Sequence, residues 1–119
     1  MEKVSIENVL RGIGVTAVET VDPLNHALAV ETVRKTADLP GVKAVIFRSP
    51  CVALFRSSKQ VSVDPDACVG CRKCIREIGC PALSFRDGKV LVDPAQCNGC
   101  TLCAQLCPAG AIRGGESHE

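Results

Sequence analysis

Cysteine is the residue type with the clearest capacity for chemistry in this chain, and its spacing is regular. The 119 residues include nine cysteines, eight of which lie after residue 57. Residues 68–81 read C-x2-C-x2-C-x5-C-P, and residues 97–108 read C-x2-C-x2-C-x3-C-P. Three thiolates placed two residues apart can wrap one corner of an iron–sulfur cubane, so that each thiolate reaches a different iron. The spacing therefore predicts two [4Fe–4S] clusters.

The two runs belong to an internal repeat. Asp64-Pro65 recurs as Asp93-Pro94, and the first three cysteines recur at the same shift of 29 residues. The fourth cysteine, with its Pro-Ala, recurs at a shift of 27, so the first copy has two extra residues. In two-cluster ferredoxins the fourth cysteine of one run ligates the other cluster. We therefore assign one cluster to Cys68, Cys71, Cys74 and Cys107, and the other to Cys97, Cys100, Cys103 and Cys80.

Zinc sites and disulfide bonds are the alternative uses for so many cysteines. Structural zinc sites pair two C-x2-C knuckles and do not need a third cysteine two residues further on. A three-iron cluster follows the loss of a ligand, and neither run lacks one. Residues 1–7 carry charges where a secretory signal would need an apolar region, so we expect a cytoplasmic chain. In that reducing compartment, dense cysteine indicates metal before disulfides.

Composition excludes several classes of partner. Fourteen basic and 13 acidic residues give a formal charge of +1 without a basic run, so nucleic acid is not expected. No apolar stretch approaches the roughly 20 residues that span a bilayer, so no membrane is expected. Aromatic residues make up only 3% of the chain, and we expect the clusters to replace part of the core. No set of residues has a plausible catalytic arrangement, so we assign no catalytic residue.

The remaining polar candidates receive simpler interpretations. We interpret the ninth cysteine, Cys51, as a packing residue, because free cysteines are among the most buried side chains. His26 is expected at the surface or in packing, and His118 in a frayed tail. Five basic residues are expected to form a solvated surface, with docking of an acidic electron carrier or tuning of the clusters as a second possibility: Arg72, Lys73, Arg76, Arg86 and Arg113.

The chain divides at residue 57 into two predicted domains. Residues 1–57 have an α/β pattern of a leading helix followed by strand, helix and strand. Residues 58–119 hold the repeat, with a hairpin around Asp87-Gly88 between its copies. The expected fold is an incomplete strand–helix–strand, Rossmann-like segment followed by a pseudo-twofold, ferredoxin-like 2[4Fe–4S] domain, an α/β plus α+β architecture.

Local signals place the elements of the first half. Ser5 is expected to cap the first helix, which Gly12 and Gly14 end. Asp22 is expected to cap the second helix, with Pro23 in its first position. The two strands are expected at 15–21 and 42–47. Two parallel strands and two helices cannot form a sheet that is covered on both faces, so this half is expected to be incomplete alone. It either packs on the other half or completes a sheet with material outside this chain.

Nearly the whole chain resembles one enzyme family. Residues 60–113 resemble a two-cluster ferredoxin domain. The first copy, with its lengthened spacer before Cys80-Pro81-Ala82, resembles the C-terminal ferredoxin domain of the indolepyruvate ferredoxin oxidoreductase alpha subunit. Residues 6–15, 21–23 and 45–51 are similar to the last part of that subunit's thiamine-diphosphate domain. The resemblance covers residues 4–113.

The resemblance implies a role in oxidative decarboxylation of aryl 2-oxoacids with electron transfer to ferredoxin. It implies thiamine diphosphate and magnesium in the complete enzyme, held by a Gly-Asp-Gly segment that this sequence lacks. The implied partners are thiamine-diphosphate-bearing and beta subunits. We therefore expect an electron-transfer module that is not catalytic by itself, either a separately encoded small subunit or the end of a longer chain. The alternative is a free-standing 2[4Fe–4S] carrier with an accessory N-terminal domain.

Overall fold

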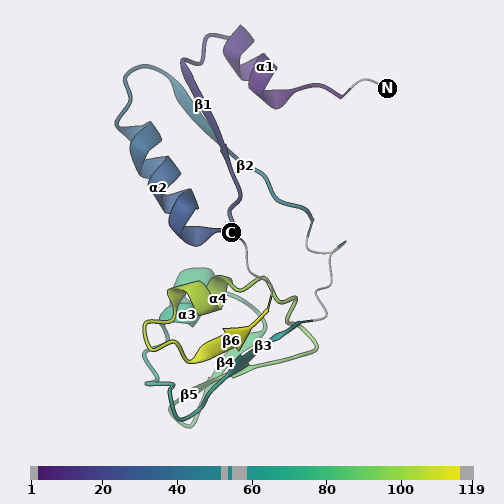
Figure 1. The fold of residues 1–119 in the computed structure, drawn as a ribbon, viewed down its shortest axis with the longest axis vertical. Helices are drawn as coiled ribbons and strands as arrows, with labels where there is room; N and C mark the ends of the chain where they lie inside the picture. Colours follow the sequence, from purple (N-terminus) through teal and green to yellow (C-terminus); the bar gives the residue numbers. More distant parts are fainter. Residues whose placement is uncertain (1–2, 52–53, 55–58, 116–119) are drawn as a thin grey trace. The chain divides into compact units, whose positions relative to one another are not determined.

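The computed structural model describes residues 3–51, 54 and 59–115, and divides the chain into two compact units, residues 1–49 and 50–119. Figure 1 shows the elements of each unit along the chain. The predicted boundary after residue 57 falls at 55–58, outside the described residues. Within the described ranges, no helix is both long enough and apolar enough to cross a membrane.

Unit 1 contains a small parallel sheet. Its strands β1 and β2 pair from Ala17 opposite Lys43 to Val21 opposite Phe47. One helix connects these strands and another precedes them, so the expected order of helix, strand, helix and strand is confirmed. The elements are α1 (Ile6–Gly12), β1 (Ala17–Val21), α2 (His26–Ala37) and β2 (Lys43–Phe47).

The first helix of unit 1 begins where the sequence predicts, but the second does not. Ser5 caps α1 and accepts a hydrogen bond from the backbone N–H of Asn8 at 3.3 Å. The predicted Asp22 cap of α2 is wrong, because Asn25 is the N-cap residue and its side chain accepts from the N–H of Leu28 at 3.2 Å. Asp22 instead accepts from the N–H of Leu24 at 2.8 Å, which commits its carboxylate to a turn before the helix.

Unit 1 leaves much of its apolar surface uncovered. Phe47 at the end of β2 is 54% exposed, and Val33 on α2 is 41% exposed. These two side chains and their neighbours line a shallow groove of about 390 Å³. Among the described residues of this unit, 3–49, only Val21, Ala29 and Thr36 are buried. The unit as described therefore has a very small core.

Unit 2 is built from two antiparallel strand pairs and two short helices that contact each other. Strand β3 pairs with β6 at the end of the described chain, a closure that the sequence did not predict. Strands β4 and β5 form the predicted hairpin, and its turn residues Asp87 and Gly88 have φ of 48° and 78°. The elements are β3 (Val61–Val63), α3 (Lys73–Ile78), β4 (Leu83–Arg86), β5 (Lys89–Val92), α4 (Leu102–Leu106) and β6 (Ile112–Gly114).

Cysteine forms part of the core of unit 2. The buried cluster contains three cysteines among eight residues, and among the described residues no large side chain is completely enclosed. This supports the expectation that apolar packing alone contributes little here. The members of the cluster are Val61, Cys68, Cys74, Leu83, Val90, Cys103, Ala111 and Ile112.

The positions of the lone candidates differ in part from expectation. Cys51 is exposed, so its interpretation as a packing residue is wrong. It follows β2 and lies outside any helix or strand, which leaves no regular element to bury it. His26 begins α2 and is partly buried, whereas His118 lies outside the described residues. Arg72, Arg76, Arg86 and Arg113 are exposed as expected, and Lys73 is partly exposed.

Candidate iron–sulfur sites

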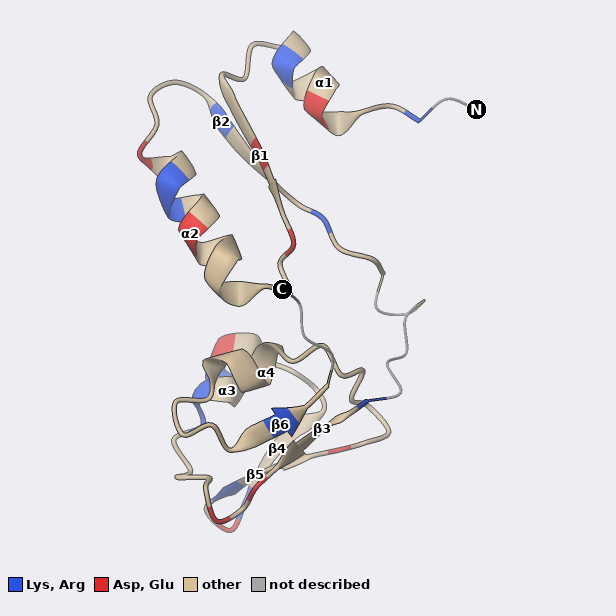
Figure 2. Cartoon of the chain, viewed as in Figure 1, with Lys and Arg blue, Asp and Glu red and all other residues tan. Residues whose placement is uncertain are grey.

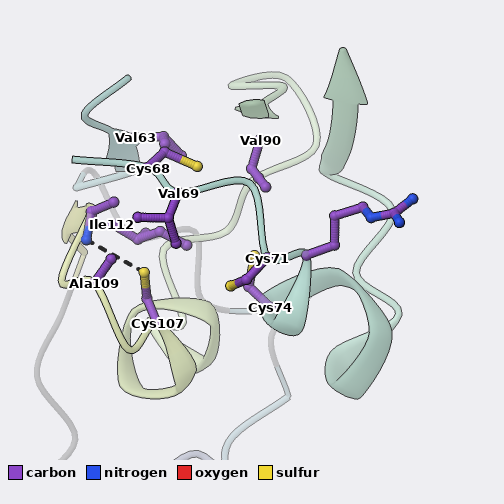
Figure 3. Close-up of a pocket in the computed structure, with 11 residues that line it drawn as sticks. Val63, Cys68, Val69, Cys71, Cys74, Val90, Cys107, Ala109 and Ile112 are labelled. Carbon is purple, nitrogen blue, oxygen red and sulfur yellow. Dashed lines mark hydrogen bonds between the residues drawn. The ribbon is translucent and has the colours of Figure 1, made fainter. Parts of the chain in front are cut away.

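Four cysteines line each of two pockets in unit 2. Figure 3 shows the first pocket, where Cys107 rises from the end of α4 toward the loop of Cys68, across from Cys71 and Cys74. The structure thus brings together the same two sets of cysteines that the spacing assigns, and the ligation itself stays a prediction. The first pocket is lined by Cys68, Cys71, Cys74 and Cys107, and the second by Cys80, Cys97, Cys100 and Cys103.

The two short helices produce this exchange between the repeats. In each copy two cysteines lie in the loop before the helix and the third lies within the helix. The chain that leaves each helix places the fourth cysteine in the other pocket. Helix α3 ends at Ile78, Gly79 is its C-cap residue, and Cys80 follows. Helix α4 ends at Leu106, and Cys107 is its C-cap residue. The fourth cysteine therefore lines the pocket of the other copy.

The Asp-Pro pair that opens each repeat holds the first cysteine of the loop. The Asp64 carbonyl accepts from the N–H of Cys68 at 3.0 Å, and the Asp93 carbonyl accepts from the N–H of Cys97 at 3.0 Å. Each carboxylate accepts from a backbone N–H two residues on, at 3.0 Å for Asp64 and 2.9 Å for Asp93. The repeated Asp-Pro was visible in the sequence, but its role as the anchor of the cysteine loop needed the structure.

Backbone N–H groups point at sulfur atoms of the first pocket. The N–H groups of Val90 and then Gly70 hold the pKa of Cys68 below its usual value, because they stabilise the thiolate. The backbone N–H of the buried Ala111 donates to the Cys107 Sγ, with the nitrogen 3.4 Å from the sulfur. Such N–H donors to cluster sulfurs are among the means by which a protein sets a reduction potential.

Burial and neighbouring thiols act in the opposite direction on the helix cysteines. Burial, and then the nearby Cys107, raise the pKa of Cys74. Burial, and then Cys100, raise the pKa of Cys103 to about 11. Crowded, buried thiols resist ionisation on their own, and a coordinated metal removes this resistance because a ligating thiol is deprotonated outright. The two helix cysteines, Cys74 and Cys103, therefore favour the thiolate form only when a positive group is bound.

The donor chemistry fits a cluster. Four thiols line each pocket, and N–H donors lie near the sulfurs of the first. A cubane needs thiolates at its corners, whereas a single zinc ion needs all of its sulfurs at about 2.3 Å from one point. Within the described part of the chain, no three His, Cys, Asp or Glu side chains form a group that could hold a single metal ion.

The hairpin β4–β5 clamps the first cysteine loop. The Lys89 Nζ donates to the Cys68 carbonyl at 2.6 Å, and the Arg72 guanidinium lies 5.0 Å from the centre of the Phe85 ring. At Gly70, an added Cβ would lie 2.4 Å from the Gly88 carbonyl oxygen. Sequence reasoning missed Lys89, which precedes the buried Val90 on β5 and lies in the charged turn at 86–89 between the two cysteine runs.

We expect Gly70→Ala to destabilise the loaded protein much more than Gly79→Ala. Both glycines have positive φ, 69° and 63°, so both substitutions carry the left-handed backbone cost of about 1–2 kcal/mol. Only at Gly70 does the new methyl also meet backbone, which adds an overpacking cost of about 1–3 kcal/mol. The measurement is the urea midpoint for loss of cluster absorbance. Equal midpoints for the two variants would contradict the close approach of the hairpin.

Comparison with known proteins agrees with this geometry. Residues 60–108 match the family model for a 4Fe-4S dicluster domain. The chain is 41% identical over 113 residues to the indolepyruvate oxidoreductase subunit IorA of Methanothermobacter thermautotrophicus, an alignment that covers 93% of this chain and 18% of the relative. The IorA of Methanothermobacter marburgensis is 43% identical over 112 residues, covering 92% and 18%. That of Archaeoglobus fulgidus is 38% identical over 121 residues, covering 97% and 19%.

These matches establish both the cofactors and the kinship. The chain spans about a fifth of the length of the relatives that it matches. Its dicluster domain and its cysteines fit two [4Fe–4S] clusters. Over nearly its whole length, the chain is homologous to a segment of the IorA subunits of indolepyruvate oxidoreductases, and its residues 60–108 belong to the 4Fe-4S dicluster domain family.

Proposed function

We propose that this chain is the electron-transfer module of an indolepyruvate-type 2-oxoacid ferredoxin oxidoreductase, and that it relays electrons through two [4Fe–4S] clusters to ferredoxin. The observation that carries the proposal is the pair of four-cysteine pockets in a chain that aligns with IorA over 93% of its length. The clusters supply one-electron oxidation and reduction when bound. The residues of this chain hold them, shield them and donate hydrogen bonds to their thiolates.

The ligation that we propose is crossed, as the pockets suggest. One cluster takes Cys68, Cys71, Cys74 and Cys107, and the other takes Cys97, Cys100, Cys103 and Cys80. We also propose that the two copies are related by an approximate twofold axis. Matching backbone supports this, since Arg72 and Thr101 stand at equivalent positions and share the left-handed conformation, with φ of 57° and 61°.

Unit 1 belongs, in this proposal, to a larger Rossmann-like sheet that is completed by the thiamine-diphosphate-bearing part of the enzyme. The support is its uncovered apolar groove, where Phe47 and Val33 are 54% and 41% exposed. Thiamine diphosphate and magnesium would be held outside this chain, and the decarboxylation would occur there. A beta subunit is the further partner, and the cytoplasm is the proposed compartment because it keeps cysteines reduced.

Anaerobic reconstitution tests the redox part of the proposal. We expect about eight irons per chain, two reducible clusters by low-temperature EPR after dithionite, and passage of electrons from the reduced protein to oxidised ferredoxin. Fewer than about eight irons would exclude two complete [4Fe–4S] clusters. Zinc bound in place of iron after purification from the native source would make the sites structural and would contradict electron transfer.

A free-standing carrier is the second candidate, and the separate compactness of unit 2 favours it. The two candidates differ in the partners that they require. Size-exclusion chromatography of the native source separates them: elution with a thiamine-diphosphate-binding partner, or within a longer chain that contains this sequence, supports the module. Elution as a stable monomer supports the carrier.

A further inference from the structure

The two cysteine runs occupy very different charge environments. Residues 69–92 contain five basic side chains and two acidic ones, Glu77 and Asp87, whereas residues 97–111 contain no charged side chain. Figure 2 shows this difference: α3 carries residues in the colours of charged side chains, whereas α4 is entirely tan. The repeat thus presents the same loop and helix twice, once cationic and once neutral. The five basic residues, called here the cationic patch, are Arg72, Lys73, Arg76, Arg86 and Lys89.

Members of the cationic patch are fixed around the first cysteine loop. Arg76 Nη2 donates to the Cys71 carbonyl at 3.3 Å, and Lys89 Nζ donates to the Cys68 carbonyl at 2.6 Å. Arg72 stays exposed while its guanidinium lies over the Phe85 ring. These contacts hold the charges at the loop and reduce the side-chain entropy that a partner would otherwise have to remove on binding.

One cysteine of the first pocket is more exposed than its counterpart in the second. Cys71 is exposed, whereas its counterpart Cys100 is only partly so. Next to these cysteines, Arg72 is exposed and its counterpart Thr101 is buried, with 8% exposure. Electron tunnelling weakens steeply with distance, so the exposed edge at Cys71 is the better place for an external carrier to approach.

The first pocket stays more positive than the second when the clusters are bound. An oxidised [4Fe–4S] cluster with four thiolates carries about two negative charges, by the ligand count. Asp64 and Asp66 precede Cys68, and Arg113 pairs with Asp64 at 3.8 Å, so six basic and four acidic side chains and one cluster sum to about zero around the first pocket. Around the second pocket, Asp93 and the cluster leave about three negative charges. An acidic protein is therefore favoured at the first pocket over the second.

We propose that the cationic patch around Cys71 is the docking surface for an acidic electron-carrier protein, and that electrons leave the chain from the cluster held by Cys68, Cys71, Cys74 and Cys107. This inference rests on the proposed function and adds the exit side and the chemistry of the partner. In the transfer one electron passes from the reduced cluster to the oxidised carrier, and no bond forms or breaks. A nucleic acid is a weaker fit, because a polyanion needs a larger positive excess than the nearly balanced charges around the first pocket supply.

The second copy supplies the substitutions that test this surface. Arg72→Thr and Arg76→Gln install the residues of the equivalent positions 101 and 105. Threonine is already accepted at the left-handed position, since Thr101 has φ 61°. The control is Arg11→Gln with Arg34→Gln, which removes two charges from exposed arginines of unit 1. The probe is an oxidised, strongly acidic bacterial-type ferredoxin, with basic cytochrome c and a short DNA duplex as comparators.

Binding is measured by isothermal titration of the oxidised, fully loaded proteins, so no electron transfer is needed for the readout. We expect Arg72→Thr/Arg76→Gln to weaken ferredoxin binding about fivefold or more at low salt, and added salt to reduce the difference. The control double variant should bind within about twofold of the wild type. Unchanged binding by the first variant, an equal loss in the control, or equally tight binding of cytochrome c or DNA would overturn the proposal.

Iron content separates this result from the proposed function. A chain that holds about eight irons but shows no patch-dependent binding contradicts the docking surface and leaves the electron-transfer module intact. If Arg72→Thr/Arg76→Gln fails to load its clusters, Arg76→Gln/Arg86→Gln replaces it, because that pair leaves Arg72 on Phe85 undisturbed. The same fivefold loss is expected, and its absence overturns the proposal.

Discussion

Replacing Cys80 with alanine is expected to destroy the cluster of the second cysteine run, although Cys80 belongs to the first run in sequence. The structure places Cys80 in the pocket of Cys97, Cys100 and Cys103. With one thiolate gone, one iron of that cluster loses its protein ligand. We expect the number of four-iron clusters to fall from two to one per chain, seen as a loss of iron and of one EPR signal after reduction. This is among the largest effects that any single substitution should have.

Double substitutions reveal which cluster is lost, because two cysteines of one cluster act as a unit and their losses do not add. Cys80→Ala combined with Cys97→Ala should still leave one complete cluster. Cys80→Ala combined with Cys68→Ala should leave none. Uncrossed ligation predicts the reverse pattern, with one cluster surviving in the second pair and none in the first. Cys107→Ala is the matched control from the other run. Combined with Cys68→Ala, it should leave one complete cluster, as Cys80→Ala does when combined with Cys97→Ala.

Sequence reasoning worked best where one local rule decides the outcome. The Asp87-Gly88 turn was predictable because both positions need positive φ, and few residues tolerate it. Ser5 was predictable as a cap because no other cap residue competes with it before α1. The grouping of the eight cysteines followed from the repeat and from a known pattern of ligand exchange, and the pockets contain the same groups.

It failed where several side chains could meet the same need or where distant segments decide. Asp22 and Asn25 can each cap a helix. The carboxylate of Asp22 already accepts a hydrogen bond from the N–H of Leu24 in a turn, so Asn25 becomes the cap. Cys51 has an apolar character that suggests burial, but the structure places it outside any element. The pairing of β3 with β6 joins Val61 to Gly114, and no local pattern in strands of three residues specifies such a partner. Lys89 was overlooked for the same reason, because its acceptor lies 21 residues away.

Removing iron from the loaded protein is expected to unfold unit 2 and leave unit 1 largely unchanged. The elements of unit 2 are too short to persist alone: α3 has six residues, α4 has five, and the strands have three or four. Isolated helices below about 12 residues and lone two-stranded hairpins are marginal in water. Three of the eight core residues are cysteines whose burial opposes ionisation, so the apolar packing that remains is small.

Anaerobic chelation followed by hydrogen exchange measures this directly. The amides of Leu91, opposite Ser84 in the hairpin, and of Arg113, central in the β3–β6 pair, should lose most of their protection when iron is removed. The amides of α2 are the internal control, because they belong to the other compact unit and that unit contains none of the eight cluster cysteines. A general loss of protection in both units would show that the chain folds as one cooperative body. Protection that persists at Leu91 and Arg113 would show that the apolar core suffices, and the crossed cysteines would then serve electron transfer without also holding the two repeats together.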